Sequence, residues 1–148
     1  MDILHLEDFS PGQSFELGSH VFSKDEIVAF ATQYDPQAFH LTDDAAGPYG
    51  GLIASGWHTG SVYMRLLVDG LLARCASLGS PGIDKMRWLA PVRPGDTLTA
   101  KLIVEEVRPS KSRPDRGIVF ARAEVTNQDG DMVFGLHAPF MIRRRENG

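Results

Sequence analysis

The stretch from Gly50 to Leu78 constrains the fold of this chain more than any other. Its apolar residues recur at the three-and-four spacing of one helical face, namely Ile53, Trp57, Met64, Leu67, Val68, Leu71 and Cys75, with Gly60 in step. We predict one helix from Leu52 to Ala76, roughly 37 Å long at ~1.5 Å per residue. A helix as long as a small domain is wide must lie at the centre of the fold.

The start of this helix is rich in glycine, with Gly50, Gly51 and Gly56 close together. Free backbone N–H groups and the positive end of the helix dipole make such a start suitable for an oxyanion or a polarised carbonyl. Alternatively, Gly56 and Gly60 simply allow another element to pack closely against the helix. The residues alone leave both interpretations open.

A strand and a helix are expected before this stretch. Residues 14–22 have the apolar pattern of a strand, with imperfect alternation. Ser23 and Glu26 then form a capping box, which predicts the start of a helix. This helix should end near Tyr34, because Pro36 disfavours helical geometry at the residue before it. Asp35 therefore lies at a helix exit, and residues 35–48 are expected to be a loop with at most a short turn of helix after Thr42.

Downstream of the long helix, the chain has the pattern of strands and turns. Four strands are predicted, at residues 83–89, 97–107, 117–125 and 132–142. Consecutive hairpins favour an antiparallel sheet, which has to bury its apolar face on the long helix. We predict a single α+β domain over residues 1–148, with a curved antiparallel sheet wrapped around one long central helix. Exposed sheet edges favour dimerisation.

Composition excludes several classes of partner. A net charge of −4 over 148 residues gives no indication of nucleic acid or an anionic membrane surface as a partner. Cys75 is the only cysteine, which excludes an intrachain disulfide and fits a reducing compartment. The N-terminus has no signal-peptide pattern, and no window is long and apolar enough to span a bilayer. The expectation is a soluble, cytoplasmic protein.

Asp35 and His40 are the residues most suited to chemistry. The sequence has no phosphate-binding loop, no dinucleotide fingerprint, no nucleophile elbow and no spacing suited to a metal. A carboxylate and an imidazole five residues apart on a loop can face one cavity and there move the proton of one water. The alternative is that Asp35 caps a helix end and His40 is structural.

Two segments resemble a known family. The run from Tyr34 to Asp43, YDPQAFHLTD, is similar to the motif of MaoC-like dehydratases and (R)-specific enoyl-CoA hydratases, in which Asp precedes His by five residues. The run from Gly50 to Thr59, GGLIASGWHT, resembles the segment leading into the central helix of that family. The turns at 91–98 and 127–130 also resemble it. Gln37 and Ala38 replace the Asn and Pro that the motif commonly has.

The resemblance implies a hot-dog fold and a hydratase or dehydratase of 2-enoyl or 3-hydroxyacyl thioesters. Asp35 and His40 would hold the water, and the Gly56 N–H would bind the thioester oxygen. The substrate contacts would come from Phe39, Gly51, Ser55 and Trp57. No metal or cofactor is implied, because coenzyme A or acyl carrier protein is part of the substrate. A homodimer or a dimer of dimers is expected.

Two other functions remain open at this stage. The hot-dog scaffold also supports acyl-CoA thioesterases, and a fold does not select a reaction. The third possibility is a non-catalytic subunit that binds acyl thioesters. The basic loop around Arg108 to Arg116 is a further candidate contact for coenzyme A phosphates, although a solvated loop fits its pattern better.

Overall fold

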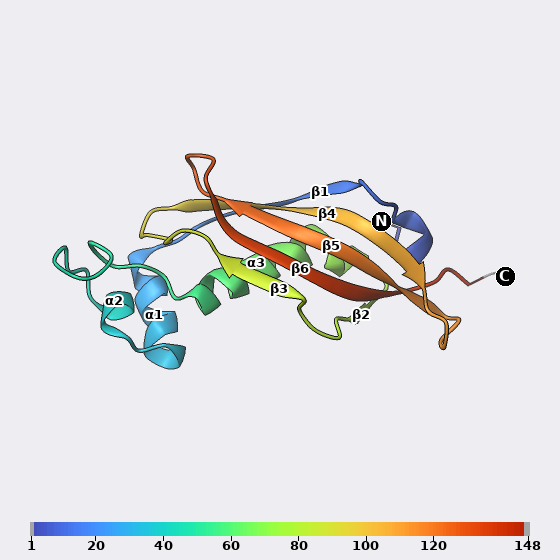
Figure 1. The fold of residues 1–148 in the computed structure, drawn as a ribbon, viewed down its shortest axis with the longest axis horizontal. Coiled ribbons are helices and arrows are strands. Elements are labelled where there is room, and N and C mark those ends of the chain that lie inside the picture. Colours follow the sequence, from blue (N-terminus) through green and yellow to red (C-terminus); the bar gives the residue numbers. More distant parts are fainter. Residues whose placement is uncertain (1, 147–148) are drawn as a thin grey trace.

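The computed structural model describes residues 2–146 and has an α+β architecture, with a curved antiparallel sheet around one central helix (Figure 1). This confirms the predicted fold class. The elements in chain order are η1 (Leu6–Asp8), β1 (Ser14–Val21), α1 (Lys24–Tyr34), α2 (Ala38–Leu41), α3 (Gly56–Gly70), η2 (Leu72–Arg74), β2 (Ser77–Gly79), β3 (Lys85–Trp88), β4 (Thr97–Pro109), β5 (Arg116–Thr126) and β6 (Met132–Arg143).

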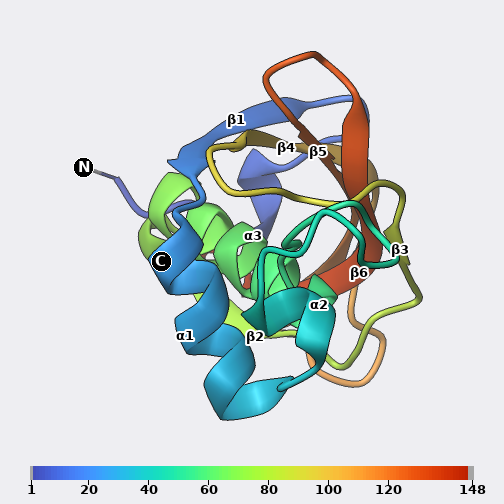
Figure 2. The same ribbon diagram turned by 90° about the vertical axis from the view of Figure 1, so that its left-hand side faces the viewer.

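The sheet has the strand order β1-β4-β5-β6-β2, and β3 also pairs with β6. All of these pairings are antiparallel. Burial alternates at every residue of β5, the period-two pattern of a strand with one face on the core. The register of β3 places Trp88 opposite Phe134. Seen from one end, the sheet curls over α3, with α1 and α2 in front (Figure 2).

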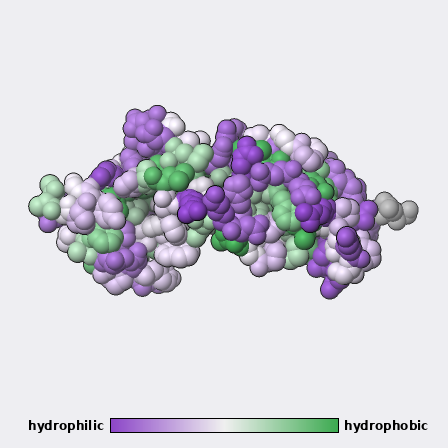
Figure 3. Space-filling model, in the orientation of Figure 1, coloured by the Kyte–Doolittle hydropathy of each residue, from purple (hydrophilic) through white to green (hydrophobic). Residues whose placement is uncertain are grey.

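The two faces of the sheet differ in polarity. Its inner face and α3 enclose a core that includes Leu98, Val104, Val119, Val125 and Phe134. Hydrophilic side chains gather across the middle of the face seen in Figure 3. Arg122 and Glu105 form a cross-strand ion pair at 3.5 Å, and both side chains are about 40% exposed. Such an exposed pair adds little to stability, so burial of the inner face holds the sheet in place.

The central helix is shorter than predicted at both ends. Gly50 and Gly51 have φ angles of 71° and 147°, and Ser55 caps the helix by accepting a hydrogen bond from the Trp57 N–H. At the other end, a Cβ on Gly70 would lie 2.7 Å from the Leu17 backbone. Glycine at the last residue of the helix therefore allows β1 to pack closely against it, and the helix ends before Leu71, whose φ of −147° is not helical. The predicted range of Leu52 to Ala76 was too long because residues 52–55 are not helical and residues 72–74 form a 3-10 turn.

The predicted apolar stripe overlaps only in part with the face that α3 buries in the core, because Leu67 belongs to both and Leu71, just after the helix, is fully buried. The buried face carries His58, Thr59, Tyr63, Leu66 and Leu67. Trp57 and Met64, from the stripe, are 60% and 47% exposed, and Trp88 is 44% exposed. His58, which is outside the predicted stripe, is buried instead. A helical period identifies an apolar face but not what covers it, and here part of that face borders an open cavity.

The first helix agrees with its sequence signals. Ser23 Oγ accepts a hydrogen bond from the Glu26 N–H at 3.1 Å, and α1 ends at Tyr34, immediately before Asp35. The second hydrogen bond of the predicted capping box, from the Ser23 N–H to the Glu26 carboxylate, is not formed among residues 2–146. The Glu26 carboxylate instead contacts His20, with Oε1 2.8 Å from Nε2. The short helix α2 precedes Thr42, whereas a turn was expected after it. No helix within residues 2–146 has the length and apolar character needed to cross a membrane.

Candidate active site

Three segments meet at one cavity of about 420 Å³. They are the exit of α1 with Asp35, the short helix α2 with His40, and the start of α3 at Gly56. The remaining wall consists mainly of apolar residues, namely Phe39, Tyr49, Ile53, Ala54, Trp57, Thr59, Trp88, Leu89, Ala90, Pro91 and Val92. A largely apolar cavity with a few converging polar groups is the common form of a small-molecule site.

Asp35 and His40 lie side by side in this cavity. Asp35 Oδ2 and His40 Nε2 are 3.2 Å apart, and their side chains are 19% and 6% exposed. The two residues are brought together because α2 is a single turn of helix directly after the Asp35–Gln37 bend, where the Gln37 N–H donates to the Asp35 carbonyl at 2.8 Å. The predicted proximity of the carboxylate and the imidazole is therefore present in the structure.

Both oxygens of Asp35 accept hydrogen bonds from neutral side chains. Gln37 Nε2 donates to Oδ1 at 2.6 Å, and the hydroxyl of Ser55 donates to Oδ2 at 2.8 Å. The hydrogen bond from Gln37 is the largest of three effects that hold the pKa of Asp35 below its usual value; the others are the hydrogen bond from Ser55 and the charge of His40. Burial acts in the opposite direction and raises this pKa. Asp35 is therefore a carboxylate at neutral pH.

His40 has a fixed tautomer. Its Nδ1 lies 2.7 Å from the carbonyl oxygen of Ile53, which only accepts hydrogen bonds, so Nδ1 carries the hydrogen. In the neutral ring, Nε2 therefore presents a lone pair toward the cavity and toward Asp35. Two acceptors at 3.2 Å repel unless a proton lies between them or a water donates to them. A water molecule that donates to both atoms would make this contact favourable.

Gly56, at the N-terminus of α3, lines the same cavity. Gly56 is the first residue of the helix, and within residues 2–146 its N–H has no hydrogen-bond acceptor. The indole of Trp88 lies over Gly56 and its Nε1–H donates to the Gly56 carbonyl at 2.7 Å. A Cβ at Gly56 would meet this indole at 2.5 Å, so a larger residue here would require the Trp88 ring to shift. Close packing and a free N–H, proposed from the sequence as alternatives, occur together at Gly56.

The four predicted substrate contacts divide into two groups. Phe39 and Trp57 line the cavity. Gly51 and Ser55 are not among the described residues that line it. Gly51 is buried, with φ at 147°, and a Cβ there would lie 2.9 Å from Asp43 Oδ1. Ser55 is fully buried, and its hydroxyl is used to cap α3 and to bind Asp35. Both residues shape the loop that carries the site.

Several residues of the site were missed by sequence reasoning. Gln37 was noted only as a departure from a motif, although its position two residues after Asp35 permits the bond it makes. Trp88 and Tyr49 lie far from the motif, and no local pattern connects them to it. Arg93 donates to the Tyr49 carbonyl at 2.6 Å beside the cavity. The basic loop before β5 lies at the opposite end of the molecule from α1 and α2 (Figure 1).

Comparison with known proteins identifies the family. A protein-family model described as "MaoC like domain" matches residues 8–126. The chain belongs to the MaoC-like family. The resemblance noted in the sequence is thereby confirmed, and the fold is the hot-dog fold. Within residues 2–146, no group of three or more His, Cys, Asp or Glu side chains is arranged to hold a metal ion.

Three individual proteins are similar to this chain over most of its length. The MaoC-like dehydratase from Rhodospirillum rubrum is 39% identical, with a TM-score of 0.86, over 97% of this chain and 99% of that one. The uncharacterized protein YdeM of Bacillus subtilis (strain 168) is 30% identical over 143 residues, which is 95% of this chain and 100% of YdeM. The R-hydratase PhaJ1 from Pseudomonas aeruginosa shares the fold, with 23% identity and a TM-score of 0.77 over 97% of this chain and 88% of that one.

Proposed function

We propose that this MaoC-like protein is an enzyme that adds water to 2-enoyl thioesters, or removes it from 3-hydroxyacyl thioesters, of coenzyme A or acyl carrier protein. The observation that carries the proposal is the contact of Asp35 Oδ2 with His40 Nε2 at 3.2 Å, in the cavity that Gly56 also lines. A water-activating pair and a donor for an enolate oxygen are the groups that this reaction needs.

The thioester carbonyl oxygen binds at the Gly56 N–H. As water adds to the β-carbon, negative charge accumulates on this oxygen, so a fixed donor stabilises the transition state more than the bound substrate. The positive end of the α3 dipole acts in the same direction. Removal of one donor of this kind typically lowers the rate ~10²–10³-fold.

His40 moves the proton, and Asp35 holds the water. The lone pair on His40 Nε2 takes a proton from water as the oxygen bonds to the β-carbon. The resulting imidazolium then gives that proton to the α-carbon, so the enzyme regains its starting state. Asp35 remains ionised because Gln37 and Ser55 donate to it. Its charge orients the water and stabilises the imidazolium.

A second copy of the chain completes the molecule. Within residues 2–146, β3 pairs only with β6, so its other edge has no strand beside it. Large hydrophobic side chains at or near this edge are exposed, namely Trp57, Met64, Ile83, Trp88 and Leu89. Edge-to-edge pairing of two copies covers such a strand and this apolar surface. A homodimer is therefore proposed, and its mass at micromolar concentration tests it.

The reaction is tested by incubating the purified protein with crotonyl-CoA and following two signals together. Loss of the enoyl absorbance without release of free thiol is the expected result for a hydratase. Thiol release at the rate of acyl turnover would instead identify a thioesterase. Saturable binding of enoyl-CoA esters of every chain length, with neither signal, would identify a non-catalytic subunit. Either of the last two results removes the proposal.

A further inference from the structure

Thr59 is a buried polar residue of the catalytic cavity to which no role has yet been given. It lines the cavity from α3, almost one turn beyond Gly56, and is 2% exposed. A second copy of the chain can only bury it further. Coenzyme A or acyl carrier protein is too large for a cavity of about 420 Å³, so this buried wall faces the acyl group and not the carrier.

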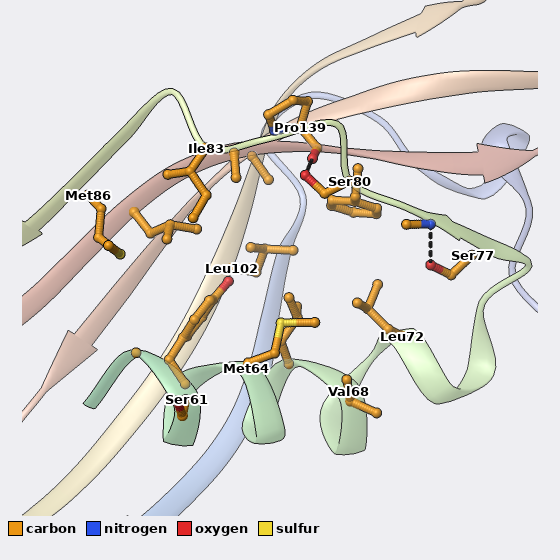
Figure 4. A pocket seen from close by; sticks show the side chains of 18 of the residues that line it. Ser61, Met64, Val68, Leu72, Ser77, Ser80, Ile83, Met86, Leu102 and Pro139 are labelled. Atoms are coloured by element: carbon orange, nitrogen blue, oxygen red, sulfur yellow. Dashed lines mark hydrogen bonds between the residues drawn. The ribbon is translucent and has the colours of Figure 1, made fainter. Parts of the chain in front are cut away.

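The Thr59 hydroxyl makes no hydrogen bond within residues 2–146, unlike three other hydroxyls on or next to helices. Thr32 and Thr42 each donate to the carbonyl four residues earlier, at 2.7 and 2.9 Å. Ser61 does the same at 2.7 Å, beside the apolar cavity between α3 and the sheet (Figure 4). This local bond is the usual one for a hydroxyl on a helix, and Thr59 lacks it.

The local acceptor of Thr59 is already occupied. The carbonyl four residues earlier belongs to Ser55, and it accepts from the backbone N–H groups of His58 and Thr59 at 3.0 and 3.1 Å. A carbonyl oxygen has two lone pairs, and both are used here. Because a buried hydroxyl without a partner is unfavourable, this one is left for a molecule in the cavity.

Thr59 is directed toward the Asp35 carboxylate. Residues four apart on a helix are neighbours, and each Cβ is tilted toward the helix N-terminus, so the Thr59 side chain leans toward Ser55. The Ser55 hydroxyl donates to Asp35 Oδ2 at 2.8 Å, and the same oxygen lies 3.2 Å from His40 Nε2. A water bound to this pair is therefore near the Thr59 hydroxyl.

Such a water needs a donor. The Asp35 carboxylate and the lone pair of His40 Nε2 are both acceptors, so the water gives one hydrogen to each. Its oxygen keeps two lone pairs, of which one forms the bond to the β-carbon. The Thr59 O–H is placed to donate to the other.

From these observations we infer that Thr59 is a third catalytic residue, whose hydroxyl donates a hydrogen bond to the water that adds to the β-carbon. This rests on the proposed function. His40 takes one hydrogen of the water as a proton and returns it to the α-carbon. The other hydrogen stays on the oxygen, which becomes the 3-hydroxyl and still accepts from Thr59. Thr59 itself transfers no proton, and its bond holds the water in one orientation.

The kinetic test compares Thr59→Val, which has the same shape without the hydroxyl, with Thr59→Ser, which keeps it. For crotonyl-CoA hydration, kcat should fall about tenfold or more in Thr59→Val, because the water loses a donor and a fixed position. KM should change by less than about twofold, since the bond is made to water and not to the substrate. Thr59→Ser should stay within about threefold of the wild-type kcat.

Stability separates this role from a structural one. Thr59→Val should unfold at the wild-type Tm or above it, because the hydroxyl it removes has no partner in the protein. Thr32→Val is the matched control: it removes a hydroxyl that bonds only to the Val28 carbonyl on α1, and its kcat should equal that of the wild type. A fall in the kcat of Thr59→Val together with a lower Tm would overturn the inference.

A high-resolution crystal structure tests the contact without turnover. It should show a water within about 3.2 Å of Asp35 Oδ2, His40 Nε2 and Thr59 Oγ1, and this water should be absent or displaced in Thr59→Val. If the water is found but no enoyl-CoA is hydrated, the contact stands and the proposed reaction fails. If crotonyl-CoA is hydrated equally by wild type and Thr59→Val, the reaction stands and the role of Thr59 is wrong.

Discussion

The Ser55 hydroxyl connects the two halves of the site, and Ser55→Ala measures that connection. The hydroxyl donates to Asp35 Oδ2 at 2.8 Å and accepts from the Trp57 N–H at 3.3 Å, so it joins the exit of α1 to the start of α3. Ser55 is fully buried. Among the described residues, the other polar contact of Asp35 Oδ2 is with His40 Nε2, at 3.2 Å. Alanine leaves both partners without this bond.

The expected loss of stability follows from these two contacts. A hydrogen bond to a charged group contributes about 1.5–3 kcal/mol. A helix N-cap contributes about 0.5–2 kcal/mol, and the 3.3 Å separation places this one at the low end. Because the Asp35 side chain is 19% exposed, water replaces part of the lost bond. The variant should lose about 2–3 kcal/mol of unfolding free energy.

Urea unfolding followed by tryptophan fluorescence measures this loss. Ser61→Ala is the matched control, because its hydroxyl lies on the same helix, is exposed and bonds only to the Trp57 carbonyl, so it should change stability by less than about 0.5 kcal/mol. The pKa of Asp35 should also rise in Ser55→Ala, which moves the acid limb of the kcat/KM profile to higher pH. A Ser55→Ala protein as stable as Ser61→Ala, with an unmoved acid limb, would refute the connecting role.

Two further perturbations test other parts of the molecule. Burial lowers the pKa of His58, against the attraction of Glu26, so the unfolded chain binds this proton more readily and stability should fall as pH drops below about 6.5. In His58→Phe, the new ring takes the place of the imidazole between Phe22 and Phe30 and has no proton to bind, so the Tm of the variant should fall less on acidification than that of the wild type. An equal fall of Tm with pH in both proteins would contradict this role of His58. Arg93→Ala should raise KM for CoA esters several-fold with little change in kcat, because the guanidinium lies beside the cavity and is available to phosphate. A fall in kcat alone would contradict that role.

The sequence predicted what depends on neighbouring residues. The start of α1 at Ser23, its end before Asp35, and the closeness of Asp35 to His40 all follow from local capping, proline geometry and a short loop. The fold class followed from consecutive hairpins, which predict an antiparallel sheet, and from the one long helix on which that sheet could bury its apolar face. These features are determined within a few residues of chain, so a single sequence contains their signals.

What the sequence missed depends on contacts between distant segments. Gly70 packs closely against the backbone of β1, and the tautomer of His40 depends on the Ile53 carbonyl. Trp57 belongs to the apolar stripe predicted for α3, yet it lines two cavities. The spacing of apolar residues shows on which side of a helix a residue lies, but it does not show what packs against that side. The donors to Asp35 come from Gln37, two residues away, and from Ser55, twenty residues away. Only the first was within reach of local reasoning.

The most direct test of the central claim is the rate of crotonyl-CoA hydration by Asp35→Asn and His40→Asn beside the wild type. Asparagine at 40 retains an N–H donor for the Ile53 carbonyl but has no basic nitrogen, so the fold is kept while proton transfer is lost. Circular dichroism and thermal unfolding verify the fold. The account predicts that kcat falls ~10²–10⁴-fold in each variant. Turnover within a few-fold of wild type in either folded variant would contradict it.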